Sequence, residues 1–105
     1  MSRKIDLCGK DDMPSGTARR FDTDGLAIAL VRIEDTFYAI GDRCSHANYS
    51  LSEGELLVEE KELECWKHGS TFSLETGKPT CLPATKPVPV YDVVLEGDRV
   101  LVVIS

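Results

Sequence analysis

The sequence predicts an all-β fold, a sandwich or barrel built from many short strands. Three observations predict it. Short apolar or alternating runs recur along the whole chain, and turn residues such as Gly, Pro and Asp separate them. No segment keeps the 3.6-residue period of an amphipathic helix over a useful length. The chain of 105 residues has the length of one domain, 1–105, and its ordinary apolar content predicts a folded core.

The predicted strands follow one another along the chain with short turns between them. The first run alternates polar and apolar residues, as a half-buried strand does. The third is apolar and rich in β-branched residues, which favours a strand. The last two form a closing hairpin. The expected strands are Lys4–Cys8, Thr17–Asp22, Leu26–Ile33, Thr36–Ile40, Leu56–Val58, Glu62–Cys65, Thr71–Leu74, Val90–Leu95 and Arg99–Ile104. The expected turns are Asp11–Gly16, Thr23–Gly25, Glu34–Asp35, Glu59–Lys61, Glu75–Pro79 and Glu96–Asp98.

Composition and charge exclude several classes of partner. The formal net charge is −6, and Lys and Arg are scattered without a basic patch. Both features argue against binding nucleic acid or an anionic membrane surface. The first residues carry no apolar segment typical of a signal peptide. No apolar run approaches the roughly 18 residues of a membrane helix. A soluble cytoplasmic protein is therefore the expectation.

Two short segments concentrate the residues that bind transition metals. Cys44 and His46 form the first pair, and Cys65 and His68 form the second. They include both histidines and two of the four cysteines of the chain, and thiolate and imidazole suit soft and borderline metals. In an extended segment, residues i and i+2 project to the same side. The 18 residues between the pairs are enough for two strands and a turn, so the pairs are expected to meet at one metal centre.

The spacing also bears on two other uses of these cysteines and histidines, a zinc site and disulfides. A structural zinc site takes the same residue types, but such sites usually pair cysteines with cysteines and histidines with histidines. A framework of two disulfides is disfavoured in the cytosol and by the placement of cysteines beside histidines. Cys8 and Cys81 lie outside the two pairs. Each is expected to be a buried free thiol that packs as a small hydrophobic residue.

The order Cys-x-His followed by Cys-x-x-His resembles the Rieske proteins. The resemblance implies a 2Fe–2S cluster with Cys44 and Cys65 on one iron and His46 and His68 on the other. It also implies the Rieske fold, an antiparallel β-sandwich with a small cluster-binding subdomain at about 42–85. Two thiolates leave the oxidised cluster formally neutral. It therefore accepts an electron more readily than a cluster with four thiolates, with potentials of roughly −150 to +300 mV.

Further motifs extend the resemblance over nearly the whole chain. Leu82–Ala84 matches a proline-containing loop that lies over the cluster in Rieske proteins, with Pro83 as its proline. Asn48–Gly54 is similar to the small ferredoxins that serve ring-hydroxylating oxygenases. The resemblance implies a one-electron carrier, not itself an enzyme. It would pass electrons from an NAD(P)H-dependent, flavin-containing ferredoxin reductase to a terminal non-haem iron oxygenase. The alternatives left open are the small Rieske subunit of an assimilatory nitrite reductase and a zinc-stabilised binding module.

The resemblance also implies where the potential falls in the Rieske range. In high-potential respiratory members two extra cysteines form a disulfide, and Tyr49 and Lys67 stand at their places here. A serine and a tyrosine in those proteins donate hydrogen bonds to cluster sulfurs, which raises the potential. Ser70 keeps the first donor, and Phe72 has no hydroxyl to supply the second. The expected potential is near or below zero, down to roughly −150 mV.

The segment 47–64 between the ligand pairs carries six glutamates and one lysine. Two interpretations stay open. The acidic segment is either a docking face for a basic partner or a solvated strand edge that charge keeps from pairing with other chains.

Overall fold

The computed structural model describes residues 3–23, 25–42, 50–65, 71–80 and 87–104. It confirms the all-β prediction, because the described elements are strands and two 3-10 turns, η1 (Lys10–Asp12) and η2 (Leu51–Glu53). The pairings between strands are antiparallel. The strands are β1 (Arg3–Gly9), β2 (Thr17–Thr23), β3 (Leu26–Ile33), β4 (Thr36–Gly41), β5 (Leu56–Leu57), β6 (Glu62–Glu64), β7 (Thr71–Ser73), β8 (Val90–Glu96) and β9 (Arg99–Ile104).

The strand positions agree with the sequence prediction, with small differences at their ends. Three predicted strands end one residue early, at Leu57, Glu64 and Ser73. Val58 and Leu74 each begin a turn, which takes them out of the ladder. Both 3-10 turns fall where no helical element was predicted, because a single turn of three residues is too short to show a helical period.

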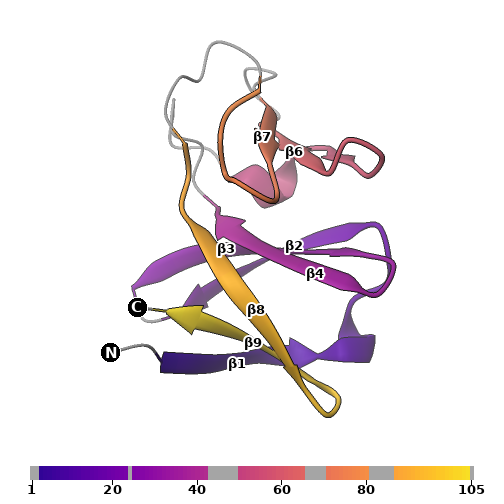
Figure 1. Cartoon of the computed structure of the whole chain (residues 1–105), viewed down its shortest axis with the longest axis vertical. Coiled ribbons are helices and arrows are strands. Elements are labelled where there is room, and N and C mark those ends of the chain that lie inside the picture. Colours follow the sequence, from indigo (N-terminus) through magenta and orange to yellow (C-terminus); the bar gives the residue numbers. More distant parts are fainter. Residues whose placement is uncertain (1–2, 24, 43–49, 66–70, 81–86, 105) are drawn as a thin grey trace.

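The strands form two sheets of different size (Figure 1). The larger sheet has the order β1-β9-β8-β4-β3-β2, and the smaller one has the order β5-β6-β7. The predicted closing hairpin is confirmed, since β8 pairs with β9 from Asp92 to Glu96. In contrast, β4 and β8 pair only through Ala39 with Tyr91 and Ile40 with Val90. This short contact joins the two halves of the larger sheet and lets the sheet curl.

Strand β3 is buried on both faces and separates two hydrophobic cores. Ile28 and Leu30 face one core, together with Val100 and Val102 of β9. The alternate residues of β3, from Ala29 to Ile33, face the other core. Burial on both sides explains why β3 is apolar without interruption from Leu26 to Val31 instead of alternating.

The second core joins the small sheet to the large one. Besides the β3 residues it contains Ile40, Leu51, Leu63, Cys65, Phe72, Leu74 and Val88. These residues come from the segments around the predicted ligands, and they place Cys65 beneath the small sheet.

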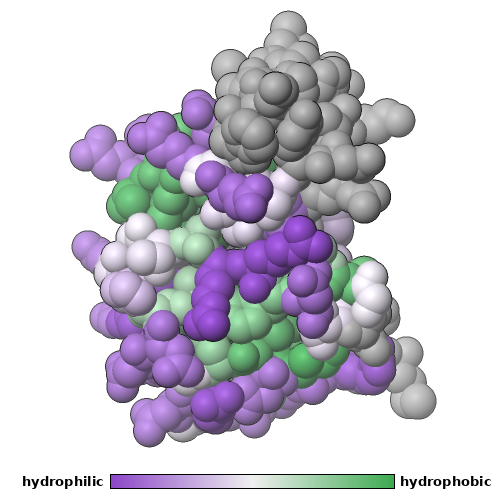
Figure 2. Space-filling view, turned by 180° about the vertical axis from the view of Figure 1, so that it is seen from behind, coloured by the Kyte–Doolittle hydropathy of each residue, from purple (hydrophilic) through white to green (hydrophobic). Residues whose placement is uncertain are grey.

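The surface seen from behind is mixed in polarity. Figure 2 shows hydrophobic areas on this face interrupted by hydrophilic residues. The large hydrophobic side chains exposed among the described residues are Val58, Val90 and Leu95. None of the helical turns in the described ranges is long and apolar enough to span a bilayer.

Candidate functional site

The structure describes two of the residues predicted for the metal centre, Cys65 and Phe72. The other predicted residues, Cys44, His46, His68, Ser70 and Pro83, lie outside the described residues, as do Tyr49, Lys67 and Cys81. Among the residues that are described, no three His, Cys, Asp or Glu side chains come together as a metal site. The geometry of the site is therefore built from Cys65 and from the ends of the segments that hold the other residues.

Cys65 directly follows β6 and is fully buried as a free thiol. It belongs to the same core as Leu51, Leu63 and Phe72, each of which is also fully buried. Leu63 lies opposite Phe72 in the β6–β7 ladder, which fixes the sheet next to the cysteine. An apolar surrounding keeps water away from the thiol, and the end of a strand gives it a fixed position.

Hydrogen bonds close the first segment, 43–49. Asp42 precedes it and Ser50 follows it, and the Ser50 hydroxyl donates a hydrogen bond to the Asp42 carboxylate. Cys44 and His46 lie between these two residues in the sequence. The two residues that flank the segment of the first predicted ligand pair are thus hydrogen-bonded to each other.

The second and third segments, 66–70 and 81–86, are tied to each other. Glu64 pairs with Thr71 across the β6–β7 ladder, which closes the second segment. The Thr80 amide donates to the Thr71 carbonyl at 2.7 Å, and the hydroxyls of the two threonines are also hydrogen-bonded. Thr71 follows the segment that holds His68, and Thr80 precedes the one that holds Pro83.

The third segment is tied to the first through close backbone contact. The Gly41 amide donates to the Pro89 carbonyl at 2.8 Å. A Cβ atom on Gly41 would lie 2.9 Å from Pro89 Cδ, so the approach needs glycine. Further along, the Val88 amide donates to the Gly77 carbonyl at 2.8 Å.

The hydrogen bonds and strand pairs at the segment ends indicate which cofactor the chain could bind. They tie the ends of all three segments into one network beside the buried Cys65 thiol. Two cysteines and two histidines on linked segments fit the mixed thiolate and imidazole set of a Rieske 2Fe–2S cluster.

The tying residues Asp42, Thr71 and Thr80 were not singled out from the sequence. Their partners are eight or nine residues away, and in a turn-rich chain Asp, Ser and Thr are normally solvated turn residues. The one signal that could have found Asp42 is a polar residue placed immediately after an apolar strand, here β4.

The free cysteine outside the site confirms one prediction. Cys8 is buried and unpaired in the other core. Burial raises the pKa of its thiol, so the group stays neutral and inert.

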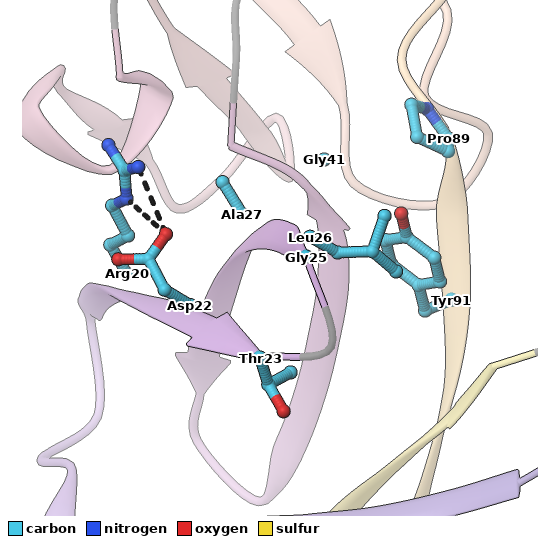
Figure 3. Close-up of a pocket in the computed structure, with 9 residues that line it drawn as sticks. All are labelled: Arg20, Asp22, Thr23, Gly25, Leu26, Ala27, Gly41, Pro89 and Tyr91. Atoms are coloured by element: carbon cyan, nitrogen blue, oxygen red, sulfur yellow. Dashed lines mark hydrogen bonds and ion pairs between the residues drawn. The ribbon is translucent and has the colours of Figure 1, made fainter.

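An open groove of about 610 Å³ lies beside the Gly41–Pro89 contact. Figure 3 shows Arg20 and Asp22 paired on one side of it, and Leu26 and Tyr91 on the other. The groove has few polar groups that converge on one point, and Arg20 is already bound to Asp22 at 3.0 Å. It therefore borders the candidate site without forming a ligand pocket of its own.

Comparison with known protein families gives a match along most of the chain. The model of the Rieske [2Fe-2S] domain matches residues 3–92. The 3-phenylpropionate/cinnamic acid dioxygenase ferredoxin subunit of Escherichia coli (strain K12) is 46% identical over 99 residues. The matched part covers 94% of this chain and 92% of that protein.

Solved structures give the same similarity in three dimensions. The ferredoxin of carbazole 1,9a-dioxygenase from Nocardioides aromaticivorans IC177 has a TM-score of 0.92 and 39% identity, covering 94% of this chain and 95% of its own. A complex of reduced oxygenase and oxidized ferredoxin in carbazole 1,9a-dioxygenase contains a chain with a TM-score of 0.88 and 38% identity, covering 94% of this chain and 91% of that one. A Mycobacterium tuberculosis protein assigned as an NADH-dependent nitrite reductase small subunit has a TM-score of 0.87 at 20% identity, with 100% and 97% covered. That last similarity concerns the fold alone.

Proposed function

The chain belongs to the Rieske [2Fe-2S] domain family, and from this premise we propose that it is the ferredoxin component of an oxygenase system. The observation that carries the proposal is the 46% identity, over nearly all of both chains, to a dioxygenase ferredoxin subunit. The family membership, the 2Fe–2S cofactor and the electron-transfer role predicted from the sequence are confirmed. The protein carries electrons and is not the catalytic component.

We propose that Cys44 and Cys65 bind one iron of the cluster and that His46 and His68 bind the other. The buried, unpaired thiol of Cys65 and the tied ends of the three segments support this assignment. Ser70, Phe72 and Pro83 are proposed to surround the cluster, and Phe72 is fully buried beside Cys65 in the core. We take about 42–85 as the cluster-binding part of the single domain 1–105.

When bound, a 2Fe–2S cluster takes up and releases one electron. The chain contributes three things to that chemistry. Leu51, Leu63 and Phe72 exclude water around the Cys65 thiol. The antiparallel β6–β7 pair fixes where that thiol stands. The hydrogen bonds at the segment ends fix the residues that flank the predicted ligands.

The proposed partners are a flavin-containing ferredoxin reductase, which draws electrons from NAD(P)H, and a terminal non-haem iron oxygenase. A solved complex of oxygenase and ferredoxin in carbazole 1,9a-dioxygenase, whose ferredoxin is similar to this chain, supports the second partner. The reductase follows from the need for an electron donor. We place the protein in the cytoplasm, where such reductases have access to NAD(P)H.

The two alternatives have less support. The similarity to a nitrite reductase small subunit is one of fold, at 20% identity, whereas the dioxygenase ferredoxins reach 46% and 39%. A zinc-stabilised binding module disagrees with the match to the Rieske domain model over residues 3–92.

Purification of the protein tests the cofactor and the function in turn. A red-brown protein with about two irons and two acid-labile sulfides per chain is expected. Stoichiometric zinc without sulfide would contradict the cluster. Reduction by an NADH-dependent flavin reductase, followed by turnover of a ring-hydroxylating oxygenase, tests the role. A reduced protein that supports a purified nitrite reductase and no oxygenase would favour the alternative.

A further inference from the structure

A buried carboxylate stands immediately before the first predicted ligand segment. Asp42 is 1% exposed, and no other charged residue is buried in the part of the chain that the structure describes. Burial of a carboxylate is costly unless hydrogen bonds and a counter-charge compensate it. Its position therefore needs an explanation in terms of the groups around it.

Both carboxylate oxygens of Asp42 bind the chain beyond the segment 43–49. The Ser50 hydroxyl donates to Oδ2, and the Ser52 amide donates to Oδ1 at 2.8 Å. The backbone of Asp42 is held as well. Its amide donates to the Ala27 carbonyl of β3 at 3.0 Å, and its carbonyl accepts from the Leu51 amide at 2.5 Å. Asp42 thus connects the two ends of the segment to each other and to β3 of the large sheet.

The positively charged residue near Asp42 is Arg20, and it neutralises the Asp42 carboxylate only in part. Arg20 Nε lies 3.6 Å from Asp42 Oδ2, but the Arg20 side chain is 48% exposed. Two of its nitrogens also donate to Asp22 Oδ1, at 3.1 and 3.0 Å. Figure 3 shows this Arg20–Asp22 pair at the side of the groove. A half-exposed arginine shared between two carboxylates leaves Asp42 with net negative character.

We propose that Asp42 is a positioning residue for the cluster. Its carboxylate holds together the residues on either side of the segment 43–49, in which Cys44 and His46 lie, and its charge, two residues before Cys44, keeps the reduction potential low. A short loop with tied ends loses less conformational freedom when it binds its cofactor. A fixed negative charge near a redox centre disfavours the added electron. This inference rests on the proposed ligand roles of Cys44 and His46.

The test compares Asp42→Asn with Asp22→Asn in the protein that carries its cluster. Both changes remove one carboxylate that faces Arg20 and alter the net charge equally, but Asp22 is exposed and makes no contact with residues 50–52 in the described structure. Two quantities are measured, the rate at which a chelator bleaches the visible absorption and the potential from voltammetry. Asp42→Asn is expected to accelerate bleaching at least about tenfold, because a hydrogen bond to a charged group is lost, and to raise the potential. Asp22→Asn is expected to leave both near the wild-type values.

A milder variant separates the two roles and guards against misfolding. Ser50→Ala removes one hydrogen bond to Asp42 and keeps the charge. It is expected to accelerate bleaching without raising the potential. The inference is overturned if Asp42→Asn bleaches at the wild-type rate. If Asp42→Asn does not fold, the same result for Ser50→Ala overturns it. It is also overturned if Asp22→Asn raises the potential as much as Asp42→Asn. A wild-type protein without iron and sulfide would instead overturn the ligand assignment, and this inference with it.

Discussion

Phe72 shows what a single buried residue contributes to this site. It is fully buried, lies opposite Leu63 in the β6–β7 ladder and shares a core with Cys65. In high-potential Rieske proteins the matching residue is a tyrosine that donates to a cluster sulfur. Phenylalanine offers similar packing without the donor, so if Phe72 lies beside the cluster as proposed, the potential can be changed here with little change to the core.

The variant Phe72→Tyr tests this separation. Its hydroxyl is expected to raise the reduction potential, since a hydrogen bond to sulfur stabilises the electron-rich reduced state. The matched control is Phe37→Tyr, which adds the same hydroxyl in the other core. It should leave the potential unchanged. If the hydroxyl of Tyr at position 72 finds no acceptor, the melting temperature falls instead, because an unsatisfied buried hydroxyl costs about 1–3 kcal/mol. A stable, correctly folded variant with the wild-type potential would contradict the predicted place of Phe72 beside the cluster.

A second prediction concerns the ion pair that joins the first and last strands. Arg99 donates to both oxygens of Asp6 at 2.7–3.1 Å, and these hydrogen bonds lower the pKa of the Asp6 carboxyl. A lowered folded-state pKa means that the unfolded chain binds more protons, so the stability from this pair is lost as pH falls through the lowered pKa. Asp6→Asn is therefore expected to lower the melting temperature slightly at neutral pH and to have no effect in strong acid. Thermal unfolding of both proteins across this range measures it. A difference that grows in acid would contradict the sign.

At the scale of elements, the turn after β7 contacts the residues that follow the third segment of the site, 81–86. Gly77 has a φ of +73°, and a Cβ atom there would lie 2.1 Å from the Val88 carbonyl oxygen. Its own carbonyl accepts from the Val88 amide. The turn therefore packs directly against the residues that follow 81–86, and only glycine permits that approach.

Gly77→Ala is expected to destabilise the protein by several kcal/mol, with Gly97→Ala as the control. Gly97 also has a positive φ, +59°, but nothing lies within 4 Å of its Cβ position. The control should cost only the roughly 1–2 kcal/mol of a left-handed conformation. Gly77→Ala adds a backbone clash to that cost and is also expected to lower iron content. Urea unfolding and iron analysis measure the two effects. Equal losses in the two variants would show that the contact with Val88 is not important.

The elements also show which parts of the fold and site were predictable. The alternating pattern of β1 and the turn at 96–98 follow from local chemistry, and the structure has both. The burial of Asp42 and the Thr71–Thr80 contact depend on chains that meet only after folding, and the sequence gives little sign of them. The ligand roles of Cys44, His46, Cys65 and His68 stay predictions, based on residue type and spacing together with the family.

At the scale of the whole molecule, exposed acidic side chains lie at the end that holds the small sheet. The small sheet lies at one end and the β8–β9 turn at the other (Figure 1). Glu59 and Glu60 are exposed in the turn between β5 and β6. Lys61 in the same turn lies 3.9 Å from Glu75, so its charge only partly offsets this acidic end. Both interpretations of the acidic segment, a docking face and a solvated strand edge, therefore stay open.

The acidic end leads to the last prediction, which concerns how the protein meets its oxygenase. If that partner offers a basic face, the rate of electron transfer should fall as salt is added. Reversing Glu59, Glu60 and Glu62 to lysine should slow transfer at low salt and weaken the salt dependence. A control triple reverses acidic residues at and near the β8–β9 turn, namely Asp92, Glu96 and Asp98.

The control makes the test specific to position. Each change from an acidic residue to lysine adds two charges, so both triples take the formal net charge from −6 to 0. If overall charge alone guides the encounter, the two variants behave alike. If the β5–β6 turn docks, only the first triple loses the salt dependence, as stopped-flow reduction of the oxygenase would measure. A wild-type rate that is indifferent to salt and to both triples would mean that docking is apolar or lies elsewhere on the surface.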